Sequence, residues 1–156
     1  MFLTQEAHIV NVIPPVDLSG GPMVGDRFSM KNHDHASILV TVGANAAGAS
    51  VGVTLKECTL ASGGTATART FKYAAETAVA GDTLGALTDA TVAGFDLHAS
   101  NDNITYVIEI GASELSAGYE WLELNIADAS STTLASAVAV LSGGRYQGDE
   151  NSTAIA

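Results

Sequence analysis

The most constraining feature of the sequence is the stretch Tyr119–Gly144, which reads YEWLELNIADASSTTLASAVAVLSGG. Apolar residues alternate with polar or small residues on both sides of a polar loop. A period of two is typical of strands that bury one face and expose the other. The stretch therefore predicts two strands joined as a β-hairpin or as a corner between sheets.

The same alternation assigns a face to each side chain in these two strands, because successive strand residues point to opposite faces. The residues expected to face the core are Leu122, Leu124, Ile126, Leu134, Val138 and Val140. Those expected to face outward are Tyr119, Trp121, Ala135, Ala137 and Ala139. A flat alanine row would allow another sheet or chain to approach closely.

Alternating segments recur upstream and predict further strands. They cover residues 27–31, 37–42, 51–58, 68–73 and 104–110. Turn signals about every 8–12 residues are typical of sandwiches and barrels, and residues 36–73 are predicted as a three-stranded meander. Residues 74–93 are predicted as loops with a short strand near Ala78–Ala80. The sequence predicts little or no helix and an all-β, antiparallel β-sandwich.

The first 25 residues are rich in turn signals and contain the pair Pro14–Pro15, which ends a short apolar segment. This segment carries Ile9, Val12 and Ile13 and predicts an extended N-terminal arm. Such an arm lies either on its own sheet or on a neighbouring molecule, and the sequence leaves both open. The expected organisation is an arm over residues 1–25 and one β-sandwich domain over residues 26–156.

Charge is distributed unevenly along the chain. Residues 1–75 hold five acidic and five basic residues, whereas residues 76–156 hold twelve acidic residues and one basic residue, for a net charge of −11. An acidic half without basic patches argues against binding to a phosphate backbone. The sequence contains no apolar run of about 18 residues, which is the length that predicts a membrane span. The N-terminus lacks signal-peptide features, so synthesis in the cytoplasm is expected.

The sequence contains no convincing catalytic or metal-binding constellation. His33-Asp34-His35 would point two imidazoles the same way in a strand, as a metal site requires, but no third ligand follows nearby and the trio falls at a predicted turn. One G-x-S-x-G match occurs at residues 48–52, but it lies in a small-residue loop followed by a predicted strand and lacks the strand-to-helix context of a nucleophile elbow. The single Cys58 lies in an apolar run and is expected to be a buried small hydrophobe. We therefore expect no enzymatic activity, no cofactor and no metal.

Trp121, the only tryptophan, is expected beside Tyr119 on the polar face of its strand. Three interpretations stay open. The ring covers the second side of a sandwich, anchors a protein–protein contact, or forms a platform for carbohydrate.

Two segments resemble a family of small structural proteins of tailed bacteriophages. They are DHASILVTVGANAAGASVGVTLKEC and ITYVIEIGASELSAGYEWLELNIADASSTTLASAVAVLSGGRYQGD, which together cover much of the chain. The family members look like capsid decoration, or cement, proteins. This sequence departs from the family pattern at His33, where an aromatic residue is more usual.

The resemblance implies a jelly-roll-like or β-tulip sandwich that assembles as a dimer or trimer on the capsid exterior. It implies the major capsid protein as partner, with no role for nucleic acid or membrane, and it supplies no catalytic residues. The residues expected to contact a partner are Ile9, Val12, Ile13, Pro14, Pro15, Tyr119, Trp121, Arg145 and Tyr146. The alternatives are a tail or connector subunit of the virion and a carbohydrate-binding β-sandwich module.

Overall fold

The structure is a computed structural model, and it describes residues 3–46, 51–97, 103–144 and 153–155. The strands are β1 (Ala7–Asp17), β2 (Met23–Val24), β3 (Phe28–Ser29), β4 (His33–Asn45), β5 (Val51–Cys58), β6 (Ala66–Arg69), β7 (Phe71–Ala75), β8 (Thr88–Ala90), β9 (Phe95–Leu97), β10 (Ile104–Gly111), β11 (Trp121–Ile126) and β12 (Thr133–Gly144). The short helices are α1 (Leu3–Glu6), η1 (Leu18–Gly20) and η2 (Ala112–Glu114). No helix in the described part of the chain has the length and apolar character needed to cross a membrane.

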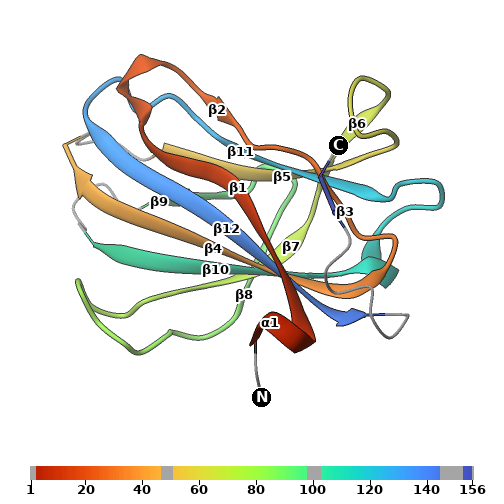
Figure 1. Ribbon diagram of the computed structural model, residues 1–156. Helices are drawn as coiled ribbons and strands as arrows, with labels where there is room; N and C mark the ends of the chain where they lie inside the picture. The colour runs from red at the N-terminus through yellow and green to blue at the C-terminus, as the bar shows by residue number, and fades with distance from the viewer. Residues whose placement is uncertain (1–2, 47–50, 98–102, 145–152, 156) are drawn as a thin grey trace.

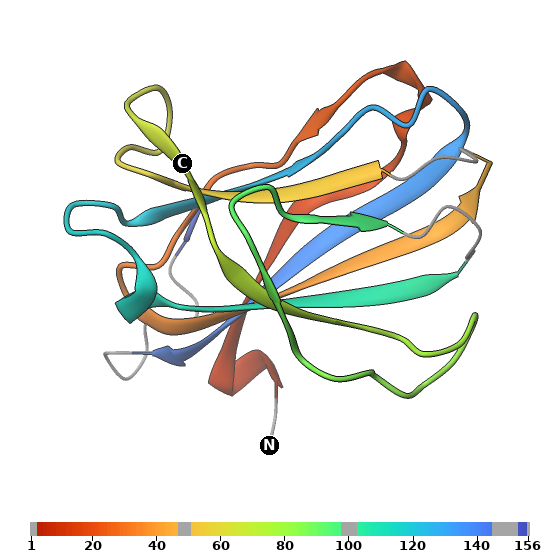
Figure 2. The same cartoon turned by 180° about the vertical axis from the view of Figure 1, so that it is seen from behind.

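The strands form two antiparallel sheets that pack face to face, so the predicted all-β sandwich is confirmed (Figure 1). We call them sheet A, with strand order β1-β12-β4-β10-β7-β8, and sheet B, with order β2-β11-β5-β6. In sheet B, β3 also pairs with β11, and β9 pairs with β5. The view from behind shows the strands of sheet A close together near the middle of the picture and spreading apart toward one end (Figure 2).

The core lies between the sheets and follows the alternation of the sequence. In β10, Ile104, Tyr106, Ile108 and Ile110 are buried, and the residues between them are half-buried. In β11, Leu122, Leu124 and Ile126 are fully buried, as predicted. Aliphatic burial of this kind stabilises a sandwich by about 25 cal/mol per Å² of apolar area removed from water.

The predicted faces of β12 were wrong. Ala135, Ala137 and Ala139 face the core, whereas Val138 and Val140 are half-buried on the outer side. The reason lies in the two flanking strands, which place larger side chains beside each alanine. Ala139 lies between Val10 and Ile38, and Ala137 lies between Ile13 and Val40. These four aliphatic side chains fill the volume beside β12, so that alanine fits there.

The chain changes sheets more often than the sequence indicated. The stretch Tyr119–Gly144 is a corner, because β11 belongs to sheet B and β12 to sheet A. The expected meander over residues 36–73 was also wrong, since β4 and β7 lie in sheet A while β5 and β6 lie in sheet B. Alternation identifies which residues are strand residues, but both sheets of a sandwich share that pattern.

The N-terminal segment is part of the sandwich, so the expected boundary at residue 25 does not separate an arm from the domain. Strand β1 pairs with β12 along the edge of sheet A, with register shifts around Asn11–Val16. Val10, Val12 and Ile13 are buried in the core. The segment thus lies on its own sheet, which is one of the two arrangements that the sequence left open.

A different segment projects from the sheet. Residues 76–94, which we call the flange, run out from β7 and return through β8 along the lower edge of the molecule (Figure 1). An isolated bridge joins Glu76 to Leu84, and the predicted strand is found at Thr88–Ala90 rather than at Ala78–Ala80. Nearly all side chains between residues 77 and 93 are exposed.

The alanine row predicts a sharp difference between the two faces of β12. Ala139→Leu should destabilise the fold by about 1–3 kcal/mol, because it overpacks a closed space between Val10 and Ile38. Val140→Leu, on the outer side of the same strand, should change the free energy of unfolding by no more than about 0.5 kcal/mol. Urea denaturation measures both, and equal effects would show that the row does not face the core.

Candidate functional site

The outer face of sheet A carries a run of aliphatic side chains. Residues directly opposite each other in antiparallel strands point to the same side, and the pairings Ile9–Val140, Val138–Leu39 and Leu39–Val107 connect four neighbouring strands. Ile9 is 48% exposed and Leu39 is 36% exposed, while the three valines are half-buried. We call these five residues the aliphatic strip.

A polar network borders the aliphatic strip. The row that contains Ile9 and Val140 continues through Ser37 to Glu109 on β10. The Glu109 carboxylate accepts a hydrogen bond from the Ser37 hydroxyl at 2.6 Å and lies 2.6 Å from His35 Nε2. The charge at this border is therefore engaged within the chain, and the strip itself contains no ionisable side chain.

The residues of the N-terminal segment that were expected to contact a partner differ in burial. Ile9, Pro14 and Pro15 are exposed. Val12 and Ile13 are buried in the core, which corrects the expectation for these two, because β1 turns them toward sheet B. Strict alternation would bury only one of these two adjacent residues, and the register shift in β1 allows the second to be buried as well. Arg145 and Tyr146 lie outside the described residues.

Tyr119 and Trp121 are both half-buried but border different cavities. Trp121 lies on β11 opposite Ser29 and Cys58 and borders a cavity of about 190 Å³ with Lys31, Asn32, His33 and the C-terminal residues Thr153 and Ala154. Tyr119 borders a second cavity, of about 230 Å³. Its hydroxyl lies 3.4 Å from the Thr67 hydroxyl. The two rings therefore do not form one continuous aromatic platform.

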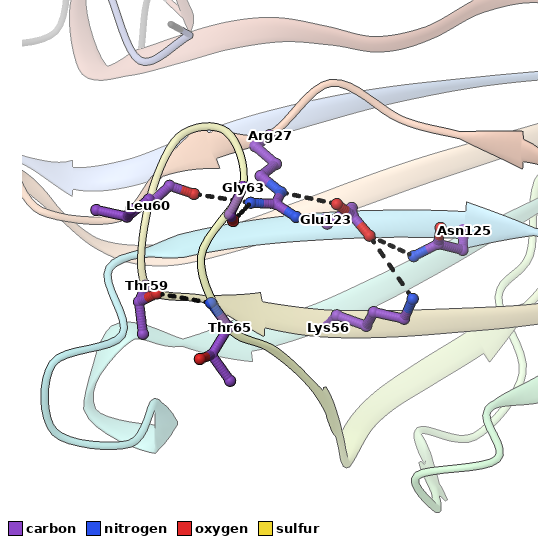
Figure 3. Close-up of polar contacts among 8 residues, drawn as sticks. All are labelled: Arg27, Lys56, Thr59, Leu60, Gly63, Thr65, Glu123 and Asn125. Atoms are coloured by element: carbon purple, nitrogen blue, oxygen red, sulfur yellow. Dashed lines mark hydrogen bonds and ion pairs between the residues drawn. The ribbon is translucent and has the colours of Figure 1, made fainter.

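Sequence reasoning missed a charged cluster on the outer face of sheet B (Figure 3). Arg27 Nε donates to the Glu123 carboxylate at 2.7 Å, and its Nη1 donates to the carbonyl oxygens of Leu60 at 2.9 Å and Gly63 at 2.6 Å. Lys56 Nζ lies 3.8 Å from the other Glu123 oxygen, which accepts from the Asn125 amide. Arg27 thus joins the loop between β5 and β6 to β11.

Burial and the neighbouring polar groups shift the pKa of the Glu123 carboxyl in opposite directions. Burial raises its pKa, but the hydrogen bonds from Arg27 and Asn125 and the charges of Arg27 and Lys56 outweigh burial and hold the pKa below its ordinary value of 4.5. The side chain is only 8% exposed, so the carboxylate is stabilised by these partners rather than by water. We interpret the cluster as a structural latch.

The other candidates from the sequence are His33, His35 and Cys58. His33 is buried at the start of β4, where its ring centroid lies 6.0 Å from that of His8, while His35 contacts Glu109. No three His, Cys, Asp or Glu side chains among the described residues form a group that could hold a metal ion. Cys58 is fully buried, as expected, and burial raises the pKa of its thiol.

Comparisons with known proteins add no identification. No family model, no curated protein and no solved structure matches this chain.

The latch predicts a pH-dependent contribution to stability. Because the pKa of Glu123 is lower in the folded state, its contribution is complete above pH 4.5 and is lost as the pH falls through the folded pKa. Glu123→Gln should cost about 1–3 kcal/mol at neutral pH, the size of a charged hydrogen bond. The difference from the unmodified chain should shrink on acidification.

Urea denaturation between neutral and acidic pH measures this difference. Glu120→Gln, an exposed carboxylate just before β11, serves as control and should change the free energy of unfolding by about 0.5 kcal/mol or less. A cost for Glu123→Gln that is constant with pH would contradict the ionised latch.

Proposed function

We propose that this chain is a non-enzymatic structural protein of a bacteriophage virion, a decoration or cement protein. It binds the outside of the capsid and stabilises contacts between major capsid subunits. The observation that carries the proposal is the aliphatic strip on the outer face of sheet A. Monomeric proteins rarely leave contiguous apolar surface uncovered without a use for it.

The position of the aliphatic strip suits a stabilising contact. Its side chains stand on four neighbouring strands, so the face presented to a partner is fixed by the hydrogen bonds of the sheet rather than by a loop. A rigid face loses little conformational entropy on binding. Apolar centres with polar borders are also the usual anatomy of protein–protein interfaces.

Charge supports the exterior of the shell as the place of binding. The net charge of −11 would be repelled by packaged nucleic acid in the interior. Outside, the same charge keeps the unbound protein soluble after its synthesis in the host cytoplasm. Many copies on one shell, as single chains or as dimers or trimers, would stabilise it even if each contact were weak.

A tail or connector position in the virion would use the same surface. Glycan binding belongs to a different class and rests on the cavity beside Trp121. A glycan array separates it from shell binding, because binding that is lost in Trp121→Ala would support a carbohydrate site. Shell binding that survives Trp121→Ala supports the capsid role.

Co-sedimentation with purified capsid shells that lack this protein tests the proposal. The chain should bind to saturation, at a copy number that matches the symmetry of the shell. Leu39→Lys places a charge at the centre of the aliphatic strip and should weaken binding about tenfold or more, as expected for a central interface residue.

Leu60→Lys is the matched control, because it makes the same substitution at an exposed leucine in the loop beside sheet B. It should bind as the unmodified chain does. If the unmodified chain does not sediment with shells, the proposed function is wrong. If Leu39→Lys binds as tightly as Leu60→Lys, the chain binds shells through another surface.

A further inference from the structure

The two edges of sheet A are built differently. At the β1 edge, Pro14 and Pro15 are exposed and lack backbone N–H groups, and the Val12 carbonyl already accepts from Asp26 N at 3.0 Å. Prolines are a common way to prevent strand pairing at a sheet edge. The opposite edge, formed by β8 and the flange, contains neither proline nor lysine between residues 76 and 94.

The flange also exposes aliphatic side chains on this open edge. Val79, Leu84, Leu87 and Val92 are all between 48% and 56% exposed. They have no core of their own to cover, because nearly every neighbour from residue 77 to residue 93 is exposed as well. Among the described residues no strand pairs with β8 on its outer side. A sheet edge that also exposes aliphatic residues is a template for an added strand.

Hydrogen bonds hold the flange in place before any partner arrives. Glu76 N donates to the Thr105 carbonyl at 3.0 Å, and the Glu76 carboxylate accepts from Thr105 N at 2.6 Å. Ala80 N donates to Asn103 O at 2.9 Å. Where the chain leaves for sheet B, Gly94 has a φ of +79°, and a Cβ there would collide with the Val53 carbonyl oxygen. A preorganised edge lowers the entropic cost of binding.

A groove beside β8 adds a charge preference. It has a volume of about 390 Å³ and is lined by Thr70, Phe71, Lys72, Asp89, Ala90, Thr91 and Glu114. Lys72 lies 2.5 Å from the Asp89 carboxylate, and both Asp89 and Glu114 raise the pKa of Lys72. Two carboxylates and one ammonium leave the groove with a net charge of −1, so a cationic side chain fits it.

A second copy of this chain is a poor source of that cation. Each copy carries a net charge of −11. Of the five basic residues that the structure describes, Arg27, Lys56, Arg69 and Lys72 already form ion pairs with carboxylates of their own chain. Charge therefore favours a different protein, with basic residues on an extended segment, over self-pairing.

We infer that the β8 edge and its flange form a strand-docking site for an extended segment of a partner protein, in which aliphatic residues flank a lysine or arginine. The segment adds to sheet A as a further strand beyond β8. Its aliphatic side chains contact the flange residues Leu87 and Val92, and its basic side chain lies in the groove near Glu114. This inference rests on the proposed function, since it assigns a second contact to the same capsid-binding protein.

Fluorescence anisotropy with a labelled synthetic decapeptide tests the site on the full chain. In the probe, valine alternates with threonine and one central threonine is replaced by lysine; a matched probe carries glutamate there. The lysine probe should bind at least about tenfold more tightly than the glutamate probe, the difference expected for one favourable charge contact. Its affinity should fall as salt rises from about 0.1 M to about 0.5 M.

Leu87→Lys should weaken binding of the lysine probe about tenfold or more, because it adds a like charge and removes an aliphatic contact at the edge. Leu60→Lys is again the control, since Leu60 and Leu87 are both 56% exposed, and it should leave the affinity unchanged within about twofold. Equal affinity for the two probes, no binding at about 1 mM peptide, or equal effects of the two substitutions would overturn the inference.

Sedimentation velocity tests the other possible occupant of the β8 edge, a second copy of this chain. If the chain alone self-associates and Leu87→Lys makes it monomeric, the edge pairs with a second copy and the inference is wrong. Two further results distinguish a failure of the docking site from a failure of the proposed function. A chain that binds the lysine probe but no shell retains the docking site and loses the capsid role, whereas Leu87→Lys protein that coats shells fully retains the capsid role without this contact.

Discussion

The fold depends on the close packing of β12 between β1 and β4. Alanine on the buried side of β12 leaves room for the aliphatic side chains of both neighbours, and these join the N-terminal segment to the core of sheet A. The same strand sends Val138 and Val140 to the other side, where they become part of the aliphatic strip. One alternating pattern therefore determines both the core and the exposed face, because successive residues of a strand point in opposite directions.

The two sheets differ in how their outer faces are covered. Over sheet B, Arg27 joins the β5–β6 loop to Glu123, and Cys58 is fully buried on the same face. Over sheet A, the described residues place no comparable layer, and Ile9 and Leu39 of the aliphatic strip and most of the flange are exposed. This asymmetry is the physical basis for assigning partner contacts to sheet A and a structural role to the charged latch on sheet B.

The sequence alone predicted the fold class and the buried side of β10 and β11, where a large apolar residue stands at every second position. It assigned the faces of β12 the wrong way round, because the larger side chain is normally the buried one, and only the neighbours of Ala137 and Ala139 reverse that preference. The latch between Arg27 and Glu123 spans 96 residues of sequence and left no local signal. The sequence also did not distinguish the flange from an ordinary loop, because the segment is rich in glycine and threonine.

The central claim is that sheet A, through its outer face and its β8 edge, meets the capsid. Hydrogen–deuterium exchange of the chain, free and bound to capsid shells, measures this directly. Bound protein should show slower exchange in the backbone amides of the flange and of residues 37–41 and 136–140, with unchanged exchange in the loop at residues 59–65. Slower exchange confined to the loop at residues 59–65 and to the neighbourhood of Trp121, with no change in sheet A, would contradict the account.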